Sequence, residues 1–475
     1  MISEYRLLQS RSVFAAEHHC SGATRRERQT KRKLIQRLGS ILIGLLLVIS
    51  ATKGNASDQN LPNPLTLSQA VAIALANNST IRTAQSRLDQ ASGRYDQSRA
   101  VLLPQVDAFA YQAWMTMNLR GLGIEIPTVS QGKQGPFGSM DARVRLTQDI
   151  LNIANREAWK SSRSRQESSR LLVENAREIV VLNVVGAYLQ ALRAKAYRDA
   201  LTDQVKLATD LYQITQDRVR QGVSAPLDAN RAQQQVNALE QQRQEAEGAY
   251  IAAKLQLANT LQAQVTSDFE VEDASAYGAE SAVDKDTAIS SALAARPDYR
   301  AAAANLRAAE LRVQAVKAER YPIIGLALSD GQSGDTPGNN QNVYRVAANL
   351  YLPIFTSGRI RGEIAEAQGY LREAQASADQ IRSQVETDVL TAIAGVEWAS
   401  KEVETSAANV RLSREEVQLS RQRFTQGVTD NTEVVNAQDR VSRADDARVR
   451  ALYTLGLARA NLARAIGAAE KTYRK

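Results

Sequence analysis

Hydrophobic residues recur at helical spacing over most of this 475-residue chain, and two of the helical stretches are unusually long. Residues 155–221 contain no proline and a single glycine, Gly186, and residues 359–426 form a matching stretch without proline. A helix of roughly 65 residues, at about 1.5 Å per residue, spans close to 100 Å. Because helices of globular proteins average about 12 residues, these two must pack along other helices as extended coils.

The segment that returns after the second long stretch carries the seam of a coiled coil. Its apolar residues follow steps of 4, 3, 4 and 3 residues, which is heptad spacing, at Ala451, Leu455, Ala458, Leu462 and Ala465. Alanine at alternate seam positions permits close approach of two helices. An ordinary antiparallel coiled coil without a lumen fits this periodicity as well as a tunnel does.

A shorter helix precedes each long one. The helical pattern covers residues 67–102, with Thr66 as its N-cap, and residues 286–320. Proline disfavours helical conformation at the residue before it, so Pro104 and Pro322 are expected to end these helices.

The segments after the two prolines change from a helical period to a period of two, which predicts β-strands. The alternation is clearest at residues 140–146 and 344–352, with partner strands predicted at 105–114 and 323–329 and loops at 121–138 and 330–342. Two explanations remain open: a small soluble sheet with one wet face, or membrane strands with an apolar side toward lipid. Four strands do not close a barrel, so a membrane barrel would need several protomers.

These elements belong to a half-molecule that is written twice. Alanine, leucine, arginine and proline positions of the first short helix recur without a gap in the second, as Ala70 and Ala288, Leu88 and Leu306, or Pro104 and Pro322 illustrate. Two copies are too few for an open solenoid. The predicted organisation is a leader at 1–56, a first repeat at 57–285, a second repeat at 286–468 and a short tail at 469–475.

The leader has the features of an export signal. Basic residues at 31–37 precede an apolar run, Leu38 to Val48, and small residues at 54–56 form a cleavage site. An uncleaved anchor is the alternative. The leader holds ten of the 59 basic and three of the 51 acidic residues, so the net charge of +8 falls to about +1 without it. Binding to nucleic acid is therefore not expected.

The remaining chain lacks the side chains that most active sites need. His18, His19 and Cys20 all lie in the leader, and the sequence contains no other histidine or cysteine. This excludes a histidine base, a thiol nucleophile, a disulfide and histidine or cysteine metal sites after cleavage. We expect no catalytic, cofactor or metal site and no enzyme activity, although catalysis by carboxylates alone stays open.

Polar residues cluster at the two turns that follow the long helices. Gly222 and Gly427 each lie four residues after an arginine, Arg218 and Arg423, which is typical of a helix C-cap. An exposed hairpin tip can also bind a partner. Six residues past each glycine stands an acid, Asp228 or Glu433. Each acid suits the first turn of a helix, or, around an axis, a ring that attracts cations.

In these features the chain resembles the TolC-like outer-membrane efflux proteins, over residues 62–468. The resemblance rests on the duplicated helices ending at Pro104 and Pro322, on the strand-to-helix segments 146–152 and 350–356, and on the paired glycine turns with their acids. It implies a mainly α fold with membrane β structure: a homotrimer in which four β-strands per protomer complete a 12-stranded barrel, continued by a tunnel of long antiparallel helical coiled coils.

The resemblance also implies a function and partners. The protein would be a passive export duct of a tripartite efflux or type I secretion system, located in the cell outer membrane with its helical part in the periplasm. Its partners would be outer-membrane lipid, a periplasmic adaptor and an inner-membrane transporter of the ABC or resistance-nodulation-division class. The absence of a cysteine after Ala56 resembles the non-lipidated branch. A structural coiled-coil protein of the envelope without a pore is the alternative.

Carried over by motif, the resemblance implies two sets of site residues. The periplasmic gate would consist of Asp228, Glu433, Asn436 and Thr429, where Asn436 replaces an acid and Thr429 a basic residue of some family members. The tips that contact an adaptor would be Arg218, Gly222, Val223, Arg423, Gly427 and Val428.

Overall fold

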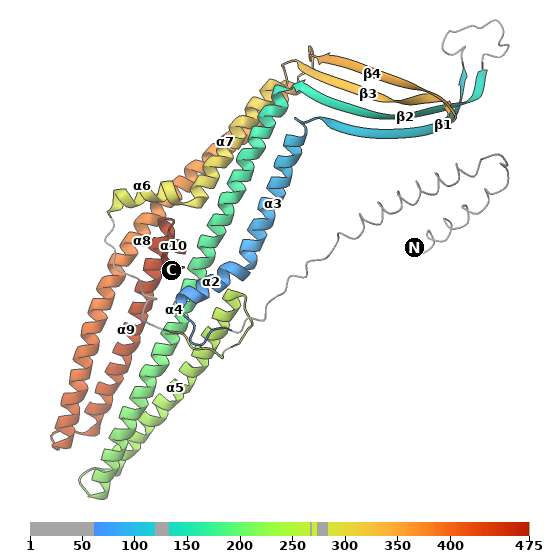
Figure 1. The fold of residues 1–475 in the computed structure, drawn as a ribbon. Helices are drawn as coiled ribbons and strands as arrows, with labels where there is room; N and C mark the ends of the chain where they lie inside the picture. Colours follow the sequence, from blue (N-terminus) through green and yellow to red (C-terminus); the bar gives the residue numbers. More distant parts are fainter. Residues whose placement is uncertain (1–60, 119–132, 267, 273–283, 475) are drawn as a thin grey trace, which may run out of the picture. The chain divides into compact units, whose positions relative to one another are not determined.

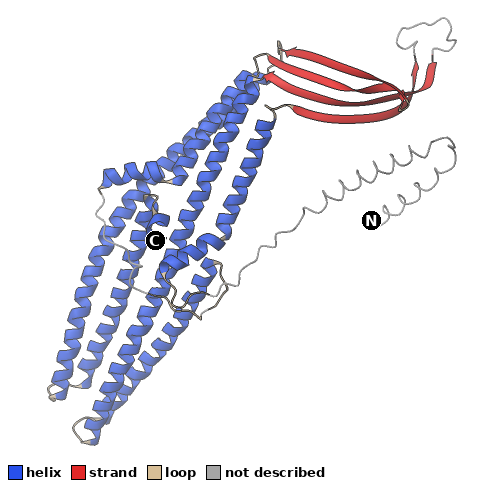
Figure 2. Ribbon diagram, viewed as in Figure 1, coloured by secondary structure: helices blue, strands red, loops and turns tan. Residues whose placement is uncertain are grey.

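A computed structural model describes residues 61–118, 133–266, 268–272 and 284–474 (Figure 1). The predicted leader at 1–56 and most of the predicted loop at 121–138 lie outside these residues. The described residues belong to one compact unit, Gln59–Lys475. Helices dominate it, and a single sheet interrupts them (Figure 2).

The same order of elements occurs twice along the chain. The first series is α2 (Leu67–Asn77), α3 (Ser79–Ala100), β1 (Gln105–Asn118), β2 (Lys133–Leu151), α4 (Ile153–Arg220) and α5 (Pro226–Leu261). The second series is α6 (Lys285–Ala295), α7 (Pro297–Ala318), β3 (Ile323–Thr336), β4 (Asn339–Tyr351), α8 (Arg359–Thr425) and α9 (Asn431–Ala465), and a short α10 (Ala469–Tyr473) follows. The two long helices, of 68 and 67 residues, confirm the predicted stretches.

The prediction of one continuous helix before each hairpin is wrong. The segment 67–102 is broken at Asn78, whose backbone is extended and whose side-chain oxygen accepts a hydrogen bond from Thr80 N at 2.9 Å. The segment 286–320 is broken at Arg296, because Pro297 lacks an N–H and disfavours helix at the residue before it. At the first break, the Asn78 side chain competes for backbone hydrogen bonds, so this residue starts a new helix instead of continuing the old one.

The strands form one antiparallel sheet in the order β1-β2-β3-β4. The predicted loop at 330–342 is mostly wrong, because β3 continues to Thr336 and β4 resumes at Asn339. Gly331 illustrates why polar, glycine-rich residues belong to a strand here. A Cβ at this position would lie 2.2 Å from the carbonyl oxygen of Ala142, so glycine allows the close approach of β2.

The two faces of the sheet differ in polarity, which confirms the predicted alternation. One face carries apolar side chains that are largely exposed, among them Val106 at 65%, Val144 at 51%, Val346 at 65% and Leu350 at 71%. The residues between them on each strand point to the opposite face, which is richer in polar and charged side chains.

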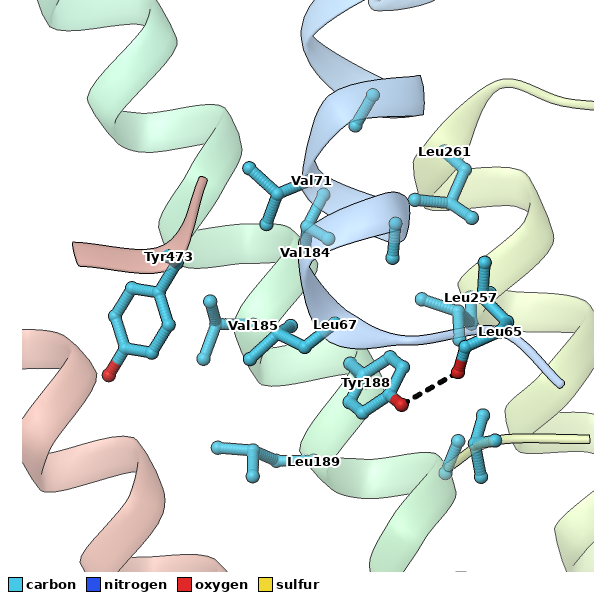
Figure 3. Close-up of a cluster of buried hydrophobic side chains, with 14 of the residues drawn as sticks. Leu65, Leu67, Val71, Val184, Val185, Tyr188, Leu189, Leu257, Leu261 and Tyr473 are labelled. Atoms are coloured by element: carbon cyan, nitrogen blue, oxygen red, sulfur yellow. Dashed lines mark hydrogen bonds between the residues drawn. The ribbon is translucent and has the colours of Figure 1, made fainter. Parts of the chain in front are cut away.

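The long helices organise the helical part. α4 packs against α3 and α7 and also against α5 and α9, while α8 packs against α7 and α9. The largest buried cluster forms where α2, α5 and α10 meet α4, around Val184, Tyr188 and Leu257 (Figure 3). There the Tyr188 hydroxyl donates a hydrogen bond to the Leu65 carbonyl at 2.8 Å.

This packing explains the apolar character of α4. Within the described chain, α4 is long and apolar enough to cross a membrane by length and composition, and 44% of that apolar stretch is buried in the protein. Its residues between Val180 and Leu192 supply the helix's share of the largest cluster. Interior packing therefore accounts for the buried part of this apolar stretch.

Candidate functional site

The glycine turns close the two long hairpins in the same way. Gly222 and Gly427 have φ angles of +74° and +75°, which only glycine adopts readily. The next residues donate backbone hydrogen bonds back into the helix, from Val223 N to Arg218 O at 3.0 Å and from Val428 N to Arg423 O at 2.9 Å. This is the Schellman pattern, so the predicted capping role of both glycines is confirmed.

The two acids lie in the first turns of the returning helices. Asp228 follows Pro226 in α5, and its Oδ2 accepts a hydrogen bond from Ala225 N at 3.2 Å. Glu433 follows the N-cap Asp430 in α9. Both acids lie at the positive end of a helix, which favours their negative charge, and Asp228 also satisfies one free backbone donor, Ala225 N.

Both carboxylate oxygens of Glu433 accept hydrogen bonds from residues of its own hairpin. Its Oε1 accepts a hydrogen bond from Arg423 Nη1 at 3.0 Å, and its Oε2 accepts one from the Thr429 hydroxyl. Three of the predicted residues are thus brought together. Thr429 therefore supplies a hydrogen-bond donor to the Glu433 carboxylate.

Arg218, by contrast, reaches from the first hairpin to the second. Its Nη1 donates to the Thr425 carbonyl at 3.1 Å, and its guanidinium lies 4.9 Å from the centre of the Phe424 ring. Its Nε donates to Ser224 Oγ at 3.2 Å, which holds the side chain in this direction. Phe424 itself is buried with Leu211 and Val434. The contact of Arg218 with the second hairpin is therefore made against a buried apolar cluster.

A second link between the tips involves residues that were not predicted. Asn431 is fully buried, and its Nδ2 donates to the backbone carbonyl of Asp228 at 3.0 Å. Arg231 donates to Thr432 Oγ1 at 3.3 Å and lies 4.0 Å from the Asp228 carboxylate. The internal repeat contained a clue to both residues. Asn431 aligns with Pro226, and Arg231 aligns with Asn436, so the two copies of the repeat differ at these positions.

The remaining predicted residues lie on the surface of the tips. Val223 and Val428 are 60% and 64% exposed, so each turn presents an apolar side chain to solvent. Asn436 is exposed on α9 and is not part of the hydrogen-bonded group around Glu433. Within the described residues, no group of three or more histidine, cysteine, aspartate or glutamate side chains is placed to hold a metal ion.

Comparison with known proteins places this geometry in a family. The model of the outer membrane efflux protein family matches residues 70–262 and 288–468, which cover both series of elements. The pyoverdine export outer membrane protein OpmQ of Pseudomonas putida is 26% identical over 416 residues, covering 81% of this chain and 82% of that protein.

Solved structures share the fold. The outer-membrane channel OprN matches with a TM-score of 0.73 at 20% identity, covering 85% of this chain and 90% of its own. The open state of the MtrE outer membrane channel of Neisseria gonorrhoeae matches with a TM-score of 0.73 at 21% identity, covering 86% and 90%. The chain belongs to the outer membrane efflux protein family.

Proposed function

We propose that this protein of the outer membrane efflux family is the passive outer-membrane duct of a tripartite efflux or type I secretion system. The observation that carries the proposal is the combination of the family match over both repeats with a sheet whose apolar face is exposed. Membrane strands have this polarity, with apolar side chains toward lipid and polar side chains toward the interior. The helical part then lies in the periplasm.

Closure of the barrel is proposed to come from two further copies of the chain. Among the described strands, β1 and β4 are each paired on one side only. Unpaired strand edges are not tolerated in lipid, because their N–H and C=O groups find no water there. Pairing of β4 with β1 of a neighbouring copy removes every edge, and three copies supply the strands of the barrel that the resemblance implies.

The hairpin tips are proposed as the periplasmic gate. Asp228 and Glu433, with Thr429 and Asn436 nearby, would constrict the entrance around the trimer axis. The cross-links made by Arg218, Asn431 and Arg231 support this role, because they hold the two hairpins of one protomer together. Movement of α8 and α9 away from α4 and α5 has to break them.

The outer surface of the tips is proposed to contact a periplasmic adaptor, which links the duct to an inner-membrane transporter of the ABC or resistance-nodulation-division class. The exposed side chains of Val223 and Val428 support this assignment, since apolar residues at an exposed turn are a common docking feature. Arg218, Gly222, Arg423 and Gly427 shape the turns on which these valines stand.

Single-channel recording of the purified protein in a planar bilayer tests the duct. We expect discrete conductance steps from detergent-extracted trimers. A folded protein that is soluble without detergent, not trimeric and silent in the bilayer would contradict the duct and favour the coiled-coil envelope protein.

A matched pair of variants on β4 tests the membrane orientation of the sheet. Val346→Arg places a charge on the exposed apolar face, and Val343→Arg places the same charge on the opposite face, since the residues are separated by three positions. Arginine toward lipid costs about 2–4 kcal/mol at mid-membrane. We therefore expect Val346→Arg to abolish assembly in the outer membrane and Val343→Arg to preserve it. Equal behaviour of the two variants would contradict a membrane sheet.

A further inference from the structure

The register of the sheet brings three charged residues into one row. Asp107 on β1 lies opposite Arg145 on β2, Arg145 lies opposite Ser329 on β3, and Ser329 lies opposite Arg345 on β4. Directly opposed residues of antiparallel strands share a face. All four side chains therefore stand on the same face of the sheet, at the same height along the strands. We call Arg145 and Arg345 the arginine pair.

The arginine pair lies on the polar face, at the level of the apolar band on the other face. The preceding row on the opposite face consists of apolar residues throughout, Val106, Leu146, Leu328 and Val346. The following row consists of Ala108, Val144, Asp330 and Tyr344, in which Asp330 is the one charged residue. Adjacent rows are separated by about 3.3–3.4 Å per residue along a strand. If the apolar band faces lipid, the arginine pair faces the interior of the barrel within the thickness of the membrane.

The charge of the arginine pair is only partly offset by the acid of its row within one protomer. Arg143, in the next row on this face, is paired with Asp141. Among the described residues, neither Arg145 nor Arg345 has a carboxylate within salt-bridge distance, and both are exposed. Asp107 is the single acid of the row. Two arginines and one aspartate leave a net positive charge in every copy.

One arginine of the pair is also held in a defined orientation. The Arg145 guanidinium lies 5.1 Å from the centre of the Phe109 ring, and Arg143 approaches the same ring at 5.9 Å. A guanidinium stacked on a ring keeps its N–H groups free at the edge, where they can bind carboxylate or phosphate in a bidentate manner. An exposed arginine without such support would lose more side-chain entropy on binding an anion.

We propose that the arginine pair forms an anion-binding ring inside the barrel, which favours solutes bearing carboxylate or phosphate groups at the exit of the duct. This inference rests on the proposed function, because closure by three copies places three arginine pairs around the barrel axis. The duct then carries opposite charges at its two ends: acids at the periplasmic entrance attract cations, and arginines in the barrel attract anions. Rings of like charge are a general means of selecting permeant ions in pores.

The experiment measures reversal potentials of purified trimers in a planar bilayer under a KCl gradient. Every barrel variant is made in an Asp228→Asn, Glu433→Gln background, so that the entrance acids do not dominate the selectivity. We expect Arg145→Gln with Arg345→Gln to lower the ratio of chloride to potassium permeability several-fold. Asp107→Asn and Ser329→Arg, which make the same row more positive, are expected to raise the ratio.

Citrate added on the barrel side probes binding directly. We expect citrate to block the current of the background channel, and expect the block to be lost in the double glutamine variant. Arg145→Lys with Arg345→Lys keeps the charge but lacks the planar guanidinium, so it should preserve the permeability ratio and weaken the block. The block should also decrease at high salt, because salt screens exposed charges.

Two failures of this experiment are distinguishable. Channels that open normally, with the same permeability ratio and the same citrate block in all row variants, would overturn the anion ring and leave the duct intact. Absence of channels from every folded trimer, the unmodified protein included, would overturn the proposed function itself.

Discussion

The two repeats of this chain build the same elements, but they use their polar residues differently. At the tip of the second repeat, Arg423 binds Glu433 of the same hairpin. At the tip of the first repeat, the equivalent Arg218 crosses to Thr425 of the other hairpin. The second hairpin is therefore closed on itself, and the first supplies the contacts between them. Duplication provided two copies of one hairpin. Divergence at a few positions then allowed the first copy to bind the second through side-chain contacts.

The breaks in the short helices also differ between the repeats, and here it is the second repeat that makes the charged contacts to another helix. In the first repeat the break relies on neutral groups, since Asn78 caps α3 and Ser79 N donates to the Gln262 side chain at 2.7 Å. In the second repeat the break is charged. The buried Arg296, at the break between α6 and α7, donates to Asp298 at 2.7 Å and to Asp388 on α8 at 2.8 Å. The second repeat thus has a group of ion pairs at its helix break, formed by Arg296, Asp298 and Asp388, which we call the ionic joint.

The largest effect is expected from removing the ionic joint. Arg296→Ala removes the cation from Asp388 and leaves Asp298 with Arg464 alone, at 3.5 Å, and breaking a buried ion pair costs about 3–5 kcal/mol. We expect about 3 kcal/mol, because the Asp388 side chain is still 34% exposed. Asn78→Ala, the matched change in the first repeat, should cost about 1 kcal/mol as a lost helix cap. Chemical unfolding followed by circular dichroism measures both, and equal losses would contradict the difference between the repeats.

A smaller effect is expected at the tips, where the comparison concerns the gate. Arg218→Ala removes the hydrogen bond to Thr425 and the contact with Phe424, together worth about 1–2 kcal/mol. The open probability of single channels should then rise about tenfold, since 1.4 kcal/mol corresponds to a factor of ten. Arg423→Ala, the matched change, leaves the contacts between the hairpins in place and should raise it much less. Similar effects of both variants would show that the asymmetry has no role in gating.

A further prediction concerns the entrance acids. Neutralising both, with Asp228→Asn and Glu433→Gln, is expected to lower cation selectivity and block by divalent cations. Asp228→Asn alone should lower cation selectivity more than Glu433→Gln alone. The Glu433 carboxylate already forms an ion pair with Arg423, whereas the nearest cation to Asp228 is Arg231, at 4.0 Å. Reversal potentials in KCl gradients measure the change, and unchanged selectivity in the double variant would count against an acidic ring.

The smallest expected effect is a pH dependence of the ionic joint. Burial alone raises the pKa of Asp298, but the hydrogen bonds and positive charge of Arg296 outweigh it, so the pKa lies below the ordinary value of 3.8. The folded state therefore binds this proton less readily than the unfolded state, and the resulting stability is present above about pH 4 and lost as the pH falls through the lowered pKa. Thermal unfolding between about pH 5 and 2 should show this loss, and Arg296→Ala should reduce it, since Arg464 and the Tyr299 N–H still lower the pKa of Asp298. An unchanged slope in the variant would assign the acid sensitivity to other groups.

Sequence patterns predicted what local chemistry determines. The long helices follow from uninterrupted helical periodicity, the turns from Gly222 and Gly427, and the two-faced sheet from alternation around Val144 and Val346. The continuation of β3 to Thr336 was missed, because its polar residues are held by pairing with β4 and not by their own strand propensity.

The contacts between the hairpins could not be predicted for a related reason. Arg218 and Arg423 stand at equivalent positions of the repeat, and only the packing of α4 against α9 decides which of them faces the other hairpin. Asn431 is an unremarkable helix-start residue in the sequence, and its burial depends on the first hairpin lying against it. The departure from Pro226 in the repeat was visible, but its consequence was not.

The unpaired edges of β1 and β4 bear on inheritance as well as on architecture. Under the proposed closure, each copy completes the edge of two others, so no copy is finished until all have joined. A chain with a damaged edge strand and intact helices can still enter a complex with normal chains. Mixed expression should then inactivate most complexes even when normal subunits are as abundant as damaged ones, and such alleles should behave as dominant.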